Sequence, residues 1–217
     1  MNSKVKKKAC LYAVAFSALT FGNAMPARAD IVVVDSVNNQ GTDNVLLNTA
    51  TDVSTVTGTL GAAGPLVNFF STGGVLSAPS SGQARVSGGL GNDPFTQLTF
   101  ALAGGDTFTR AVFNINADTD GSATFLVQGV NITGGSFSQN FAVDANGENF
   151  FTIDAINGQL ISSISLTGIG GVMFEDVRQV RIGEAVAAIP EPETYALMMA
   201  GLGAIGFMAR RRKQKRS

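Results

Sequence analysis

The sequence predicts an all-β fold, an antiparallel β-sandwich of jelly-roll type, flanked by an amino-terminal signal helix and a carboxy-terminal transmembrane helix. Aliphatic and phenylalanine residues alternate with Thr, Ser, Asn and Asp through the middle of the chain, and all but four of the 26 glycines are spread among them. No long stretch there repeats every 3.6 residues. Short strands separated by frequent turn signals favour a sandwich over alternating strands and helices.

The first 29 residues have the three parts of an export signal. A lysine-rich start is followed by the apolar residues 9–22 and by the small-residue cleavage site Ala27-Arg28-Ala29. As a helix the apolar part is about 21 Å long, shorter than the roughly 30 Å hydrocarbon core, so a retained membrane anchor is the weaker alternative. We therefore expect export by the Sec machinery, cleavage by signal peptidase and a mature chain that begins at Asp30.

Charge is distributed unevenly along the chain. From Asp30 to Ile189 there are four arginines and fourteen acidic residues, a net charge of −10, with no lysine or histidine. Nucleic-acid binding is excluded for this body, because it requires clustered cations. Cys10 is the chain's one cysteine and lies in the signal, so disulfides and sites built on His or Cys are excluded as well.

The carboxy-terminal end has three parts in a fixed order. Pro190-Glu191-Pro192 is stiff and predicted to be extended, because proline fixes φ and pushes the residue before it out of the helical region. Residues 194–209 carry no charge and form a short transmembrane segment, about 24 Å long as a helix. The basic tail 210–216 holds this segment at the inner membrane and leaves the body outside. Its membrane-stop residues are Arg210, Arg211, Arg212 and Lys213.

This order and spacing resemble a PEP-CTERM sorting signal, which here covers Ile189 to Ser217 with Pro190-Glu191-Pro192 as its motif. The resemblance implies recognition by an exosortase, a membrane-embedded transpeptidase-like protease of Gram-negative bacteria. It also implies processing near the motif and delivery to the cell surface or an extracellular polysaccharide matrix. An ordinary single-pass anchor with a proline linker is the alternative. The predicted division is a signal at 1–29, a β-sandwich domain at 30–188 and a sorting signal at 189–217.

Within the body, apolar residues two apart predict individual strands. The last strand has its apolar residues out of strict alternation, which predicts a bulge. Gly- and Asn-containing turns at 118–121, 134–135, 146–147 and 157–158 predict hairpins. Residues 38–91 alternate weakly, so we expect long loops or edge strands there. The predicted strands are 96–102, 111–116, 123–127, 151–155, a segment around 164–166, and 172–182.

Calcium is the metal ion that this composition allows, because the body offers only oxygen ligands and has excess negative charge. Asp118 and Asp120 beside Gly121 resemble the start of an acidic calcium loop, and residues 144–148 form a second oxygen-rich cluster. Neither contains the full twelve-residue loop with its closing glutamate. The alternative is that these are ordinary solvated turn residues.

Sugar binding and catalysis are the two functions that remain to be weighed. The body contains no Trp or Tyr, but the doublets Phe69-Phe70 and Phe150-Phe151 each turn one ring outward if their strands are regular. The alternative is that both rings of each doublet are buried between two layers or under a loop. Catalysis would have to depend on paired carboxylates, such as Asp118 with Asp120. Glu175 and Asp176 are poor candidates, since neighbours on a strand point to opposite faces.

We therefore predict an exported, non-catalytic cell-surface or matrix protein without a required cofactor. An exosortase sorts it through Pro190, Glu191 and Pro192, and its β-domain associates with exopolysaccharide. The alternatives are a secreted carboxylate-dependent enzyme acting on glycans and a calcium-stabilised adhesin.

Overall fold

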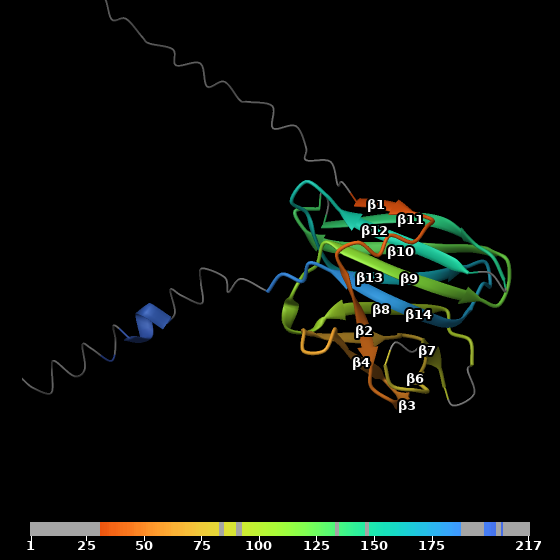
Figure 1. The fold of residues 1–217 in the computed structure, drawn as a ribbon, viewed down its shortest axis with the longest axis horizontal. Helices are drawn as coiled ribbons and strands as arrows, with labels where there is room; N and C mark the ends of the chain where they lie inside the picture. Colours follow the sequence, from red (N-terminus) through yellow and green to blue (C-terminus); the bar gives the residue numbers. More distant parts are fainter. Residues whose placement is uncertain are drawn as a thin grey trace, which may run out of the picture.

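The structure is a computed structural model, which describes residues 31–82, 85–89, 93–132, 135–145, 148–187, 198–202 and 205. The described body consists of fourteen strands and one short 3-10 helix at Ala103–Gly105 (Figure 1). The first seven strands are β1 (Ile31–Val34), β2 (Thr42–Leu47), β3 (Ala50–Val53), β4 (Thr55–Leu60), β5 (Leu66–Phe70), β6 (Leu76–Ala78) and β7 (Arg85–Gly88). The remaining strands are β8 (Gln97–Leu102), β9 (Arg110–Ala117), β10 (Gly121–Val130), β11 (Ser136–Val143), β12 (Asn149–Ala155), β13 (Leu160–Ile169) and β14 (Phe174–Gly183).

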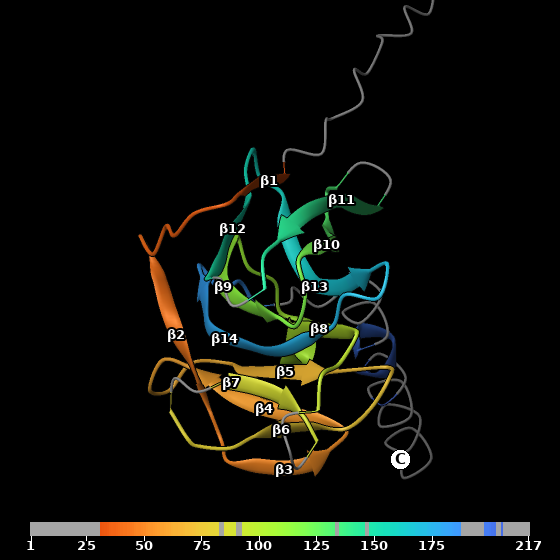
Figure 2. The same cartoon turned by 90° about the vertical axis from the view of Figure 1, so that its right-hand side faces the viewer.

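The strands form two layers that face each other, seen side by side in Figure 2. One layer runs β1-β12-β9-β14, and β7, with the small strands β6 and β3, continues from β14. The other layer runs β4-β5-β8-β13-β10-β11. β2 pairs with β14 on one side and with β4 on the other, so the layers are parts of one continuous, nearly barrel-like sheet. The predicted all-β antiparallel architecture is confirmed, because the pairings between the described strands are antiparallel.

Phenylalanine rings fill the space between the layers. Phe113 in β9 contacts Phe100 in β8 and Phe125 in β10, with ring centroids 5.7 and 5.6 Å apart. Phe151 in β12 meets Phe125 edge to face at 4.7 Å. All four rings are at most 1% exposed. Alternation in the sequence places one side of each strand in this core, and the edge-to-face ring contacts add to the burial energy.

The predicted strands between residues 96 and 182 are present as β8, β9, β10, β12, β13 and β14. The predicted bulge in the last strand is confirmed. The register of β14 against β9 shifts between Phe174 and Asp176 and again between Arg178 and Arg181. Gln179, inside the second shift, has a φ of 54°. The shifts let Val177 and Ile182 both face the core although they are five residues apart.

The expectation of loops or edge strands at residues 38–91 is wrong for most of this region, which contains β2 to β7. β4 and β5 lie inside the sheet, where β4 pairs with β2 and β5, and β5 pairs with β8. A glycine weakened the sequence signal. Gly58 occupies a core-facing position in β4, where an added Cβ would lie 2.8 Å from the Cγ1 atom of Val45. A core-facing position in a strand normally carries an apolar side chain. At Gly58 the side chains of Val45 and Leu47 on β2 occupy that space instead.

Three of the four predicted hairpins are also wrong. β10 and β11, the strands on either side of residues 134–135, pair as predicted. The connections at 118–121, 146–147 and 157–158 instead join strands that do not pair with each other. At the last of these the local turn is correct, since Asn157 and Gly158 have φ of 56° and 79° and the Gln159 N–H donates to the Ile156 carbonyl. Each connection crosses from one layer to the other, so its two strands diverge beyond the turn.

Beyond the body, the described residues include a short helix at 198–202. Among the described residues, no helix has the length and apolar character needed to cross a bilayer. The predicted signal helix at 1–29 lies outside the described residues, as does most of the predicted transmembrane segment 194–209.

Candidate functional site

The residues predicted to direct export and sorting lie outside the described part of the chain. These are Ala27, Ala29 and Asp30 at the signal cleavage site, Pro190, Glu191 and Pro192 in the motif, and Arg210, Arg211, Arg212 and Lys213 in the basic tail. Their roles stay predictions from the sequence.

Asp118 and Asp120, the candidate calcium ligands, lie in the connection from β9 to β10. Oδ1 of Asp118 accepts hydrogen bonds from the Met173 N–H at 2.8 Å and from the Thr119 hydroxyl at 3.2 Å. Oδ1 of Asp120 accepts from the Ala145 N–H at 2.7 Å. Both carboxylates therefore hold neighbouring loops in place. Calcium binding there stays a prediction.

Of the second oxygen-rich cluster, Asp144, Asn146 and Glu148, the backbone of Asp144 is held by Asn149 at the start of β12, while Asn146 lies outside the described residues. The amide oxygen of Asn149 accepts a hydrogen bond from the Asp144 N–H at 2.8 Å, and its NH2 group donates to the Asp144 carbonyl at 2.9 Å. Asn149 is 7% exposed. Among the described residues no group of three or more His, Cys, Asp or Glu side chains is arranged to hold a metal ion.

The side chains of Glu175 and Asp176 point apart, as their sequence positions predict. Glu175 is exposed and accepts a hydrogen bond from the Asn116 amide at 2.7 Å. Asp176 is 2% exposed and lies 3.4 Å from both Nη1 of Arg85 and Nε of Arg178. The two acids do not share a site.

One ring of each Phe doublet faces outward, as predicted. Phe70 in β5 is 39% exposed while Phe69 is fully buried. Phe150 in β12 is half-buried while Phe151 is 1% exposed. The two outward rings are on different layers, so the structure does not bring them together.

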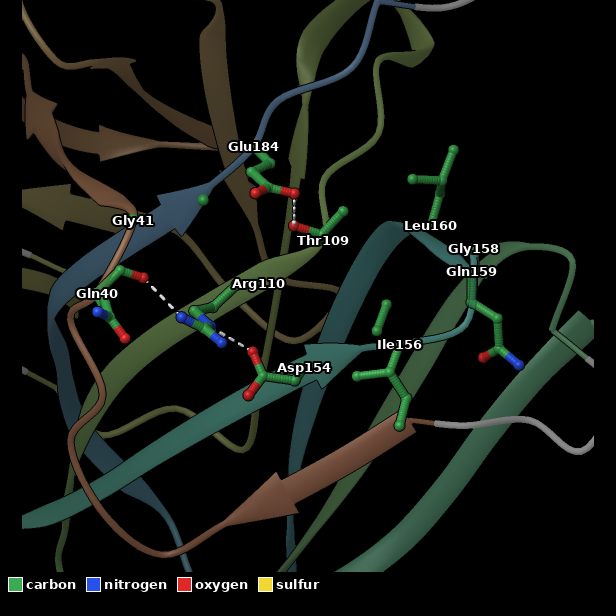
Figure 3. Close-up of a pocket in the computed structure, with 12 residues that line it drawn as sticks. Gln40, Gly41, Thr109, Arg110, Asp154, Ile156, Gly158, Gln159, Leu160 and Glu184 are labelled. Carbon is green, nitrogen blue, oxygen red and sulfur yellow. Dashed lines mark hydrogen bonds and ion pairs between the residues drawn. The ribbon is translucent and has the colours of Figure 1, made fainter.

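A cavity of about 390 Å³ lies where β9 begins and where β12 and β14 end (Figure 3). The loop before β2 and the turn from β12 to β13 complete its walls. Its lining residues are Gln40, Gly41, Thr109, Arg110, Asp154, Ala155, Ile156, Gly158, Gln159, Leu160, Gly183 and Glu184. This volume falls within the range of small-ligand pockets.

Arg110 and Asp154 form the polar centre of this cavity. They are partners in the β9–β12 register, so their side chains are on the same face, and Nε of Arg110 is hydrogen-bonded to Oδ1 of Asp154. Nη1 of Arg110 donates to the Gln40 carbonyl at 2.6 Å. Gly183 gives this arrangement room, because an added Cβ would lie 3.2 Å from the Cβ of Arg110 and 2.8 Å from the Gly41 carbonyl oxygen. The guanidinium is therefore held between a carboxylate and a backbone carbonyl.

A second carboxylate and two aliphatic side chains complete the cavity. Oε2 of Glu184 accepts a hydrogen bond from the Thr109 hydroxyl at 3.1 Å. Ile156, which is 43% exposed, and Leu160 lie across the cavity from this pair. Polar planar groups beside apolar surface match a polyhydroxylated ligand that also presents C–H groups.

The carboxy-terminal segment matches a known sorting motif. A family model for the PEP-CTERM protein-sorting motif matches residues 188–213. The chain carries a PEP-CTERM protein-sorting motif.

The PEP-CTERM motif indicates an exported protein and implies processing by an exosortase. It occupies the end of the chain, after the last described strand, and so says nothing about the chemistry of the β-domain. None of the curated proteins matches the chain. A mutant of a family 29 carbohydrate-binding module is a similar solved structure, with 12% identity, 76% coverage of this chain, 99% coverage of that chain and a TM-score of 0.27. No conclusion about fold or ligand follows from a likeness of that size.

The sequence did not reveal the cavity. Arg110 and Asp154 are 44 residues apart and meet only because β9 and β12 pair. The rarity of cations in the body was the one available signal, since a partly buried arginine is usually paired with an acid. Which acid it contacts depends on the register.

Proposed function

We propose that this protein is a non-catalytic component of the cell surface or extracellular matrix whose β-domain associates with exopolysaccharide. Its signal peptide directs Sec export and is removed by signal peptidase after Ala29. The carboxy-terminal segment then holds the chain at the inner membrane of a Gram-negative bacterium, with the body periplasmic, until an exosortase acts near Pro190-Glu191-Pro192. The PEP-CTERM match supports this sorting route.

The cavity at Arg110 and Asp154 carries the binding part of the proposal. Sugar hydroxyls both donate and accept, and the cavity offers carboxylate acceptors, amide groups and a fixed guanidinium. Ile156 and Leu160 supply apolar surface for the C–H face of a sugar ring. The proposed ligand is one sugar unit or chain end of the polysaccharide.

Binding of oligosaccharides prepared from the producing organism's own exopolysaccharide tests this proposal by calorimetry. E184Q keeps an oxygen for the Thr109 hydroxyl but removes the charge, so we expect affinity to fall about tenfold, as for loss of a charge-assisted hydrogen bond. E175Q is the matched control. Glu175 lies on β14, the strand that Glu184 directly follows, and like Glu184 it accepts one side-chain hydrogen bond, but it is outside the cavity. Equal weakening by both variants, or no binding to the unaltered chain, contradicts the proposal.

The same oligosaccharides separate binding from catalysis. Asp154 and Glu184 are two carboxylates in one cavity, but each already accepts a hydrogen bond from a neighbouring side chain. We therefore expect no new reducing ends on prolonged incubation. Cleavage that D154N or E184Q abolishes would establish the enzyme alternative, and D118N with D120N applies the same test to the turn carboxylates.

A further inference from the structure

The second layer of the sandwich contains no charged residue in any of six adjacent strands. None of β4, β5, β8, β13, β10 and β11 includes Asp, Glu, Lys or Arg. All four arginines of the body lie in β7, β9 and β14, in the other layer. In a body with a net charge of −10, this whole layer is electrically neutral.

Hydroxyl and amide groups cover the outer side of this layer. Val56, Phe69 and Phe100 point into the core, so the residues alternating with them point outward. We call these outward side chains the hydroxyl face. The registers place its middle row across five strands as Phe70, Thr99, Ser165, Leu126 and Ser138. Thr99 and Ser165 are only 7% and 9% exposed, so Phe70 and Ser138 are the members of this row most open to a ligand.

Neighbouring groups on the hydroxyl face are linked by hydrogen bonds between paired strands. The hydroxyls of Thr99 and Ser165 lie 2.7 Å apart, and the Thr124 hydroxyl donates to the Asn140 amide oxygen at 2.9 Å. Each pair consists of residues directly opposite in the sheet. These bonds hold the side chains in fixed positions before any ligand arrives, which lowers the entropy that binding would lose.

Two further pairs extend this pattern to both sides. The Thr57 hydroxyl donates to the Asn68 amide oxygen at 3.2 Å, and the Ser163 hydroxyl donates to the Gln128 amide oxygen at 3.1 Å. Because these amides accept through oxygen, their NH2 groups keep two donors each. No described residue accepts a hydrogen bond from the NH2 groups of Asn68, Gln128 or Asn140.

We propose that the hydroxyl face binds a chain of neutral polysaccharide laid across the strands. Six strands at about 4.8 Å spacing span about 24 Å, enough for several sugar units. Sugar hydroxyls match the fixed donors and acceptors of the face, and the 39%-exposed ring of Phe70 offers a surface for sugar C–H groups.

Charge selects the class of polymer. A polyanion is repelled by the net charge of the body, and no strand of this face carries a charged side chain that could pair with a charged polymer. The inference rests on the proposed association with polysaccharide and adds a second surface, separate from the cavity, for the length of the chain.

Affinity electrophoresis of the exported chain tests this inference. The gels contain β-glucan, xyloglucan, galactomannan or dextran as neutral probes, and alginate or polygalacturonate as polyanions. We expect at least one neutral polymer and neither polyanion to retard the protein. F70A should weaken that retardation about tenfold. F150A is the matched control, because Phe150 is the outward ring of the other doublet and lies on the other layer. Thermal melting confirms that both variants fold.

Each result distinguishes this inference from the proposed function. Loss of retardation with F70A but not F150A supports the hydroxyl face. Loss with E184Q while F70A binds normally contradicts it and leaves the cavity as the binding site. Retardation by a polyanion, or by none of the neutral polymers, overturns the inference. So does a dimer in sedimentation that F70A dissociates, because the face would then bind a second copy of the chain.

Discussion

Asn114 in the middle of β9 is fully buried, and neither of its amide atoms has a hydrogen-bond partner among the described residues. It lies opposite Arg178 in the register of β9 and β14. A buried amide without partners costs about 1–3 kcal/mol, because it loses its bonds to water and gains none in the protein. This residue therefore weakens the buried centre of β9, where its neighbours from Ala111 to Ile115 are apolar.

Replacing Asn114 with leucine, which has nearly the same shape, should raise the free energy of unfolding by about 1–3 kcal/mol in chemical denaturation. Val112 is the matched control, since it lies two residues earlier on the same face of β9 and is 1% exposed. V112N should lower the unfolding free energy by a similar amount. A loss of stability in N114L would mean that a buried water satisfies the amide.

At the scale of elements, β10 and β13 remain paired over almost their whole length because a bulge adjusts their register. The register shifts between Gln128 and Gly129. A Cβ at Gly129 would lie 1.9 Å from the Leu160 carbonyl oxygen and 2.9 Å from the Cδ1 atom of Ile132. Backbone occupies the space that any side chain at this position would need. The bulge therefore requires glycine.

G129A should lower the free energy of unfolding by about 1–3 kcal/mol, the usual cost of overpacking, because the Leu160 backbone must move. G74A is the control. An added Cβ at Gly74 has nothing within 4 Å, so we expect no loss of stability there. Chemical denaturation of the two variants measures the difference. Equal stability would show that the β10–β13 register can shift to accept a side chain.

At the scale of the whole molecule, the two ends of the chain and the β-domain between them carry opposite net charge. The cations of the sequence are concentrated at the two ends, and the four arginines of the body lie in one layer. In the proposed function the ends direct export and sorting, whereas the neutral layer and the cavity lie on the β-domain. Sorting and binding can therefore be altered separately.

E191A should abolish processing, so that intact-mass spectrometry finds the basic tail on protein from the envelope fraction. The unaltered chain should have lost both Met1–Ala29 and the basic tail. E193A is the control, since it removes an acid just outside Pro190-Glu191-Pro192. Equal effects of the two variants would show that local negative charge matters rather than the motif. Survival of the tail on the unaltered chain would favour an ordinary membrane anchor.

The strands were predictable where side chains alternate cleanly, as in β8, β9 and β10, because burial of one side of a strand leaves a period of two in the sequence. β4 was harder to predict, because Gly58 interrupts its apolar positions. The turn predicted at Asn157-Gly158 is present, with positive φ at both residues, but the strands on either side of it, β12 and β13, do not pair with each other. A turn determines local direction, but the pairing of the next strand depends on where apolar surface remains to be buried.

By itself, the sequence determined the all-β antiparallel architecture, the bulge in β14 and the sorting motif, since each depends on residues close together in the chain. It left open whether one ring of each Phe doublet is exposed, which the structure decided. Only the tertiary structure decided that six uncharged strands lie side by side and that Arg110 meets Asp154. Strand order and register join distant segments, and they are selected by how completely both layers bury their apolar sides, a property that no single segment contains.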